Sequence, residues 1–229
     1  MHLSILAQTD HYIVVAKPAG LMVHRSKLAR DDFYALQLVR DQVGRYVHPI
    51  HRLDRATSGC LLFAFDAEWA RLLQDALGNG VKSYLAQVRG NIRTTEPIDI
   101  RNPMKDDNGQ LRDAHTWAVG ICGSDDPRCA LMLAKPSTGR FHQVRRHLRD
   151  LNHPVLMDST HGDTRCNRWW RDHSSLSRLA LHCWRMQLAL PDGQLDVTCP
   201  IPKDLGDVWQ QMPWWAEARD TLGLSCSNV

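Results

Sequence analysis

The stretch His51-Arg52-Leu53-Asp54-Arg55-Ala56-Thr57-Ser58-Gly59 places one aspartate between two arginines, directly before a turn-like Thr-Ser-Gly. A guanidinium on each side of Asp54 favours the ionised form of its carboxylate, and a carboxylate that attacks a substrate must be ionised and held still. Arginine is also the side chain best suited to nucleic-acid phosphates. The pattern therefore indicates a nucleophile in a phosphate-binding setting, although many Arg-Asp pairs are surface salt bridges worth about 0–1 kcal/mol.

The segments around this stretch predict a mixed fold. Cys60 to Phe65 is typical of a buried strand, and residues 67–77 place their apolar side chains on one face of a helix. Further strands are expected at Leu3–Ala7, Tyr12–Ala16, Tyr84–Val88, Thr116–Ile121, Ala130–Ala134, Leu179–Leu190 and Leu195–Thr198, and further helices at Asp31–Val43, Phe141–Leu151 and Leu205–Met212. Residues 91–114 are polar and typical of a loop. Because strands outnumber helices and hairpins are frequent, we expect an α+β fold with a mixed, mainly antiparallel β-sheet and flanking helices.

A second dense stretch is Gly139-Arg140-Phe141-His142-Gln143-Val144-Arg145-Arg146-His147-Leu148. Glycine followed by polar residues at a helix start is a natural anion site, because backbone N–H groups point outward there. Arg145 could pair with a distant carboxylate, and Asp54 is the obvious candidate. From Gly139 to Arg171 there are seven arginines and three aspartates, a local charge of +4. Such a concentration is the footprint of phosphate binding, and its alternative is a solvated helix face.

The bulk composition sets broad limits on the class of protein. The 229 residues are enough for one large domain, and the formal charge of +3 is too small to prove a nucleic-acid partner. The seven cysteines include no Cys-x-x-Cys pair, which favours reduced thiols over a disulfide or zinc framework. No signal peptide is visible and the longest apolar run is too short to cross a bilayer. We therefore expect a cytoplasmic protein without a membrane partner.

Other chemistries fit the residues less well. His51 lies three residues before Asp54, which invites a metal site completed by His142 or His161. That spacing lacks the helical two-histidine pattern of common hydrolases, and the neighbouring arginines would repel a cation. Ser58 does not lie in a Gly-x-Ser-x-Gly elbow, and no glycine loop for a nucleotide phosphate is present. We therefore expect no metal and no cofactor.

Lys82-Ser83-Tyr84 places an aromatic residue at the start of a predicted strand. Such a tyrosine commonly packs in a core. The functional alternative is a ring that stacks on a base removed from its helix, as base-modifying enzymes require.

Three of these motifs together resemble the RluA-type pseudouridine synthases. Val15–Leu21, His51–Arg55 and Gly139–Arg145 occur in the order and rough spacing of that family, and Leu181-His182 is similar to its last motif. The likeness covers nearly the whole chain, so it implies a single catalytic domain of the pseudouridine synthase fold over residues 1–229. It also implies that the family's frequent N-terminal S4-type RNA-binding module is missing, and that the catalytic domain itself binds RNA.

The resemblance implies roles for individual residues. Asp54 would initiate cleavage of the C1′–N1 glycosidic bond, after which the freed uracil would rotate and rejoin the sugar through C5. Tyr84 would stack on the base and help to take the C5 proton, and Arg145 would pair with Asp54. Arg52 would fill the gap left by the flipped uridine. The expected substrate-binding residues are His51, Arg52, Arg55, Arg140, His142, Gln143 and Arg146.

A finer likeness concerns the branch that modifies uridine 65 of tRNA. It rests on Val23-His24-Arg25-Ser26, Arg40–Gly44, Arg145–Leu148, and Asp158–Asp163 with Asn167-Arg168. It implies an isomerase of the intramolecular transferase type that acts in tRNA processing. It also implies that the protein is a monomer and that its partner is RNA. The alternatives are an RluA-type synthase for ribosomal RNA and a non-catalytic RNA-binding protein on the same scaffold. A purely binding protein would not need the set of Asp54, Tyr84 and Arg145.

Overall fold

The structure is a computed structural model that describes residues 2–25 and 33–224. The chain forms two compact units, the first made of Met1–Lys82 and Cys183–Cys199, the second of Ser83–His182 and Pro200–Val229. Strands β5 (Val81–Arg89) and β11 (Leu181–Leu190) each begin in one unit and continue in the other. The expected single domain over residues 1–229 stays a prediction.

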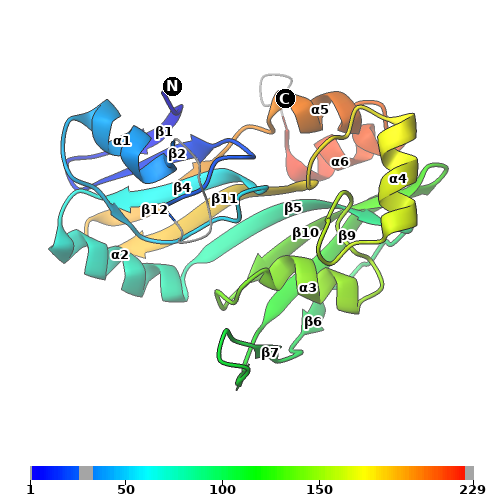
Figure 1. The fold of residues 1–229 in the computed structure, drawn as a ribbon, viewed down its shortest axis with the longest axis horizontal. Coiled ribbons are helices and arrows are strands. Elements are labelled where there is room, and N and C mark those ends of the chain that lie inside the picture. The colour runs from blue at the N-terminus through cyan, green and yellow to red at the C-terminus, as the bar shows by residue number, and fades with distance from the viewer. Residues whose placement is uncertain (1, 26–32, 225–229) are drawn as a thin grey trace. The chain divides into compact units, whose positions relative to one another are not determined.

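The first unit is built on a sheet with the strand order β1-β2-β4-β11-β12, in which β3 also pairs with β4 (Figure 1). The pairs β1–β2, β2–β4, β3–β4 and β11–β12 are all antiparallel. The further elements are β1 (Ile5–Gln8), β2 (Tyr12–Lys17), β3 (His48–Pro49), β4 (Ser58–Ala64), β12 (Gly193–Thr198), α1 (Ala35–Val43) and α2 (Ala67–Asn79). Helix α2 packs on β3 and β4.

Strand β4 forms the centre of the first unit. All seven of its residues are buried, which explains why its sequence from Cys60 to Ala64 is an unbroken apolar run rather than an alternating one. Gly59 has a φ of +124°, and a Cβ at this position would collide with the backbone carbonyl of Cys183. Glycine is therefore required here by the backbone conformation and by the close approach of β11.

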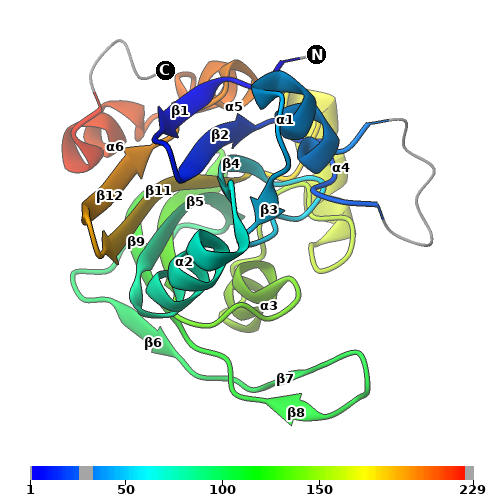
Figure 2. The ribbon, with the colours of Figure 1, turned by 90° about the vertical axis from the view of Figure 1, so that its left-hand side faces the viewer.

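The second unit contains a sheet with the strand order β5-β10-β9-β6 and a separate β7–β8 hairpin. Figure 2 shows this hairpin standing apart from the sheet of its unit. The elements are β6 (Ile98–Ile100), β7 (Met104–Lys105), β8 (Leu111–Arg112), β9 (Thr116–Asp125), β10 (Arg128–Pro136), α3 (Gln143–Asp150), α4 (Thr164–His173), α5 (Lys203–Trp209) and α6 (Trp215–Leu222). Helix α3 packs on β9 and β10, and α6 packs on β9.

The predicted α+β class with mainly antiparallel sheets is confirmed, and so are the segments with the clearest patterns. Helix α2 forms where the apolar face predicted it, with the Asp66 carboxylate accepting a hydrogen bond of 2.8 Å from the Trp69 N–H. The β11–β12 hairpin also forms as predicted. In the described part of the chain, no helix is long and apolar enough to span a bilayer.

Other segments differ from the prediction. Helix α1 begins at Ala35, and the two aspartates expected at its head, Asp31 and Asp32, lie outside the described residues. Helix α3 begins at Gln143 rather than Phe141, because His142 has a left-handed backbone with a φ of 54°. The segment 91–114, expected as loop, contains the short strands β6, β7 and β8. Helices α4 and α6 were not expected, since their charged and aromatic residues follow no simple apolar period.

Candidate functional site

The Asp54 loop lies in the first unit between β3 and β4. Its Leu53 side chain is buried and anchors the loop, while Asp54 is partly buried and Arg52 is exposed. The carbonyl of Asp54 accepts a hydrogen bond of 3.0 Å from the Thr57 N–H, which closes the turn into β4. The turn therefore lies at Arg55-Ala56, directly after Asp54, whereas Ser58 and Gly59, which were expected in the turn, begin strand β4.

The side chain of Lys17 holds the residue after Asp54. Lys17 is 1% exposed, and its ammonium donates hydrogen bonds to the carbonyls of Pro18 (2.8 Å), Leu21 (2.7 Å) and Arg55 (3.2 Å). Gly20 adds a reciprocal pair, because its N–H donates to the Arg55 carbonyl (2.7 Å) and its carbonyl accepts from Arg55 Nε (3.0 Å). A buried cation bound to three carbonyls makes a rigid support for the Asp54 loop. Lys17 was not predicted as a site residue, although it lies in the Val15–Leu21 motif that carries part of the resemblance.

His51 is held against β4. Its Nε2 accepts a hydrogen bond of 3.2 Å from the Leu62 N–H, so this nitrogen carries no proton. Burial, with a smaller contribution from the positive charge of Lys82, lowers the pKa of His51 to about 3. The imidazole is therefore neutral at pH 7 and acts as a backbone acceptor. A contact between His51 and substrate, which the resemblance implied, stays a prediction.

In the second unit, the buried amide of Gln143 organises the start of α3. Its Oε1 accepts from Thr138 Oγ1 (2.7 Å) and from the Arg140 N–H (2.9 Å). Its Nε2 donates to the His115 carbonyl (2.8 Å) and to Thr116 Oγ1 (3.0 Å). With all four positions of the amide used inside the protein, its geometry favours bracing of the loop over direct contact with a substrate.

Arg145 forms a buried, two-pronged ion pair with Asp158. Arg145 Nε and Nη2 each lie 2.7 Å from a carboxylate oxygen of Asp158, and the two side chains are 7% and 1% exposed. The N–H groups of Thr160 and His161 donate to the same carboxylate at 2.9 Å. Burial raises the pKa of Asp158, but the hydrogen bonds from Arg145 and from the two N–H groups outweigh it and hold that pKa below its usual value.

Asp158 was not predicted as a site residue. Its carbonyl accepts hydrogen bonds from the Gly162 N–H (3.1 Å) and from Asn167 Nδ2 (2.9 Å), so the whole Asp158–Gly162 turn is tied to α4. The signal available in the sequence was its place in the Asp158–Asp163 stretch of the finer likeness. Only the folded chain shows that this stretch supplies the carboxylate that fixes Arg145.

The remaining predicted residues of the second unit lie around the start of α3, apart from Tyr84. Arg140 is exposed and its Nε donates to the Asp113 carbonyl (2.9 Å), and His142 Nδ1 lies 3.0 Å from His161 Nε2. Arg146 is partly exposed on α3. Tyr84 is buried on β5, opposite Ala134 of β10.

The structure thus gathers the predicted residues into two groups. His51, Arg52, Asp54 and Arg55 share one loop of the first unit, and Arg140, His142, Gln143, Arg145 and Arg146 share one segment of the second. The predicted pair of Asp54 and Arg145 joins residues of different units and stays a prediction. Among residues 2–25 and 33–224, no group of three or more histidine, cysteine, aspartate or glutamate side chains is placed to hold a metal ion.

The fold is similar to that of two solved structures whose names refer to pseudouridylate synthase domains. The chain is similar to the solved structure "Human RNA Pseudouridylate Synthase Domain Containing 1", with a TM-score of 0.70 and 23% identity over 88% of this chain and 84% of that one. It is also similar to "Human RNA Pseudouridylate Synthase Domain Containing 4", with a TM-score of 0.68 and 22% identity over 97% and 94% of the two chains. These likenesses define the class of fold.

Sequence comparison narrows this class to a family. The family model described as RNA pseudouridylate synthase matches residues 11–150, which include the Asp54 loop and Arg145. The chain is 40% identical to tRNA pseudouridine synthase C of Pasteurella multocida, over 86% of this chain and 90% of that protein. It is 35% identical to tRNA pseudouridine synthase C of Vibrio vulnificus, over 92% and 94%. The chain belongs to the RNA pseudouridylate synthase family.

Proposed function

We propose that this protein isomerises a uridine of tRNA to pseudouridine. The observation that carries the proposal is the family match over residues 11–150, in which the Asp54 loop is intact and braced by Lys17. The name of the substrate class comes from relatives called tRNA pseudouridine synthase C, which this chain matches over nine tenths or more of their length. The finer assignment, uridine 65, rests on the sequence likeness around Asp158–Asp163 and Asn167.

The reaction rearranges bonds within one nucleotide. The Asp54 carboxylate starts the sequence that breaks the bond between C1′ of the ribose and N1 of the uracil. The uracil turns within the site, C5 bonds to C1′, the C5 proton leaves, and N1 ends with a proton. Substrate and product contain the same atoms and electrons, so the isomerisation itself consumes no redox partner and no nucleotide.

The second unit supplies the other proposed catalytic groups. Tyr84 stacks on the detached base and helps to remove the C5 proton, which suits a phenol carried on a buried strand. Arg145 pairs with Asp54, and its positive charge offsets the negative charge of that carboxylate. The ion pair with Asp158 fixes the Arg145 guanidinium through its Nε and Nη2 atoms. Because Asp158 prevents rotation of the guanidinium, the cation is preorganised for the proposed contact with Asp54.

A single substitution tests the catalytic assignment. A tRNA transcript carrying tritium at C5 of its uridines releases tritium when pseudouridine forms, and primer extension after carbodiimide treatment locates the product. We expect Asp54→Asn to release no tritium above background while its circular dichroism spectrum is unchanged. The matched control is Asp41→Asn, which alters an aspartate of the same unit that is 65% exposed, and we expect full activity from it.

Two further results would decide the substrate. A transcript with cytidine in place of uridine 65 should yield no product, whereas product at another uridine would reject that finer assignment. Separately from the substrate, full activity of Asp54→Asn would reject the proposed catalytic role of its carboxylate. Product formation in ribosomal RNA and not in tRNA would replace tRNA as the substrate class.

A further inference from the structure

The second unit contains a cavity of about 680 Å³ that the proposed catalytic residues do not line. Its walls come from the end of β5, the turn between β9 and β10, the segment after α3, and helix α4. Tyr84 lies five residues before Arg89 on β5, so the cavity lies about 16 Å along the strand from the tyrosine. This volume falls within the roughly 300–1,000 Å³ typical of ligand sites.

Two arginines line the cavity, and they differ in how firmly the protein holds their guanidinium groups. Arg89 is held in place, because its Nη1 lies 2.5 Å from Asp163 Oδ2 and its Nη2 donates to the Asn152 carbonyl at 3.4 Å. Arg128 is exposed, and within the described residues its guanidinium makes no hydrogen bond or ion pair. The carboxylate of Asp126 is also exposed at the rim. Among the described residues, Arg128 thus offers a cation that no ion pair holds, beside the fixed cation of Arg89.

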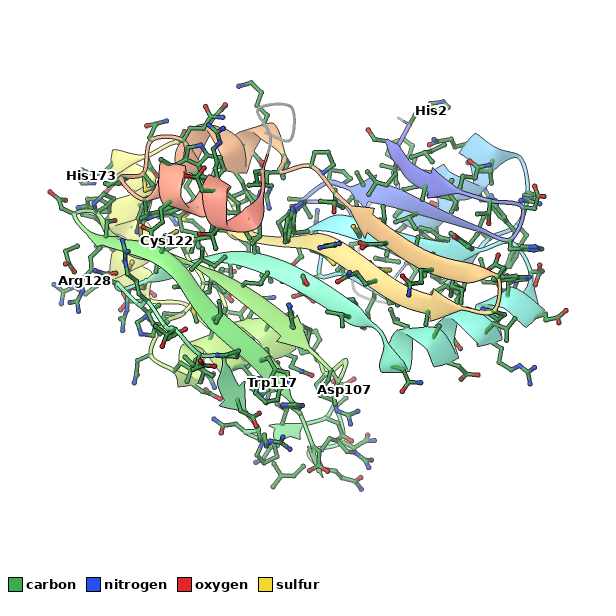
Figure 3. All side chains as sticks on the ribbon, turned by 180° about the vertical axis from the view of Figure 1, so that it is seen from behind. His2, Asp107, Trp117, Cys122, Arg128 and His173 are labelled. Carbon is green, nitrogen blue, oxygen red and sulfur yellow. The ribbon has the colours of Figure 1, made fainter. Side chains whose placement is uncertain are left out.

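An exposed tryptophan forms the wall from α4. Trp169 is 42% exposed, its ring stacks on His173 with 4.7 Å between ring centroids, and its edge contacts the buried Trp170. These contacts fix the orientation of the indole and leave much of its surface uncovered. Figure 3 shows Arg128 and His173 at the same end of the second unit, away from Trp117 and Asp107. An aromatic surface and a cation therefore face the same cavity.

The surroundings favour a nucleic acid over a protein as the ligand. Helix α4 carries three arginines and one aspartate, and its arginines are all exposed. Trp169 is the one exposed large apolar side chain among its described residues, so the helix presents a single aromatic ring among cations rather than an apolar stripe. Base stacking on aromatic rings combined with arginine contacts to phosphate is the usual chemistry of single-stranded nucleic-acid binding.

We infer that this cavity is a second RNA-contact site, which takes one unstacked nucleotide of the RNA substrate, with its base on Trp169 and its phosphate at Arg128. The inference rests on the proposed function for the choice of RNA as ligand. The site contributes to affinity and not to the chemical step, because it lies well away from Tyr84 along β5. It would add to the binding of the nucleotide that reacts and would help to set which RNA is accepted.

Binding measurements on four variants test this inference. We expect Trp169→Ala to raise the Kd for a tRNA transcript, and the KM, by about 5- to 150-fold, the range found when a base-stacking aromatic is removed, with kcat within twofold of the native value. Arg128→Gln should weaken binding and reduce the slope of log Kd against log salt by about 1. Tyr46→Ala and Arg71→Gln, exposed aromatic and arginine residues of the first unit, are the matched controls and should bind as the native protein does.

The outcomes separate the two proposals. The inference is overturned if Trp169→Ala and Arg128→Gln both bind tRNA within twofold of the native Kd. It is also overturned if the control variants lose as much affinity as the cavity variants. Binding can be measured without turnover. If the native protein binds tRNA but forms no pseudouridine, the proposed function is rejected, and the comparison of Kd values still shows whether the cavity contacts RNA. Circular dichroism confirms that each variant is folded.

Discussion

Replacing Asp158 with asparagine should destabilise the second unit severely. The carboxylate accepts two hydrogen bonds from Arg145 and two from backbone N–H groups. Asparagine keeps the size of the side chain but replaces one oxygen with an NH₂ group. Whichever way the amide is turned, its NH₂ faces an N–H donor, and the Arg145 charge stays buried without its partner.

The magnitude follows from the burial of this pair. Breaking a buried ion pair by removing one partner costs about 3–5 kcal/mol, a large part of the roughly 5–15 kcal/mol that stabilises a typical domain. With a urea m-value of about 2–3 kcal/mol/M, the unfolding midpoint should fall by about 1–2.5 M. Six of the eight tryptophans belong to the second unit, so tryptophan fluorescence reports mainly on its unfolding.

The pH dependence gives a second, independent readout. The pKa of Asp158 is lowered in the folded protein, so the unfolded chain takes up this proton first as the pH falls. The stabilisation is therefore fully present above the ordinary aspartate pKa of about 4 and is lost as the pH falls towards the folded value. The difference in unfolding free energy between native protein and Asp158→Asn should be constant from pH 8 to pH 5 and should narrow below about pH 4.

The control for this variant is Asp150→Asn. Asp150 is the last residue of α3, the helix that carries Arg145, and it pairs with Arg149, but the two side chains are 25% and 46% exposed. Its replacement should change the unfolding free energy by less than about 1 kcal/mol. A loss of less than about 1 kcal/mol in Asp158→Asn, or a difference from the native protein that stays constant down to pH 3, would refute the reasoning.

Two further substitutions test other parts of the structure. In Gly162→Ala, the new Cβ would collide with the Asp158 carbonyl, so we expect a loss of more than about 2 kcal/mol of unfolding free energy. The control Gly139→Ala, with no heavy atom within 4 Å of its Cβ, should be nearly neutral. Equal effects of the two variants in urea unfolding would contradict the proposed collision at Gly162. His51 has a folded pKa of about 3, so below the unfolded pKa of about 6.5 the unfolded state binds the extra proton, and the native protein should lose about 1.4 kcal/mol through this group between pH 7.5 and pH 5.5. His51→Asn should lack that contribution, and an unchanged pH slope would show that the imidazole is not held neutral.

The sequence predicted well those parts of the fold in which a local residue pattern is compatible with only one type of secondary structure. The apolar spacing of residues 67–77 specifies α2, and the long strand pattern before Pro191 specifies the β11–β12 hairpin. Helix α4 was not predicted, because its two tryptophans, Trp169 and Trp170, are adjacent and surrounded by arginines, so they do not repeat at helical spacing. Its packing is revealed only by the folded chain, whereas its first turn is capped locally by the Asp163 carboxylate, which accepts from the Cys166 N–H.

The sequence by itself determined the antiparallel α+β character, because periodicity and turn residues are properties of neighbouring residues. The Asp54 motif and the resemblance to the family also came from the sequence, through motifs that keep their order along the chain. The tertiary structure alone decided which charges are buried and which partners they have. Lys17 and Asp158 became recognisable only when the chain brought Arg55 to the first and Arg145 to the second. The physical reason is that the cost of burying a charge depends on groups that are distant in sequence, and folding is what places those groups beside it.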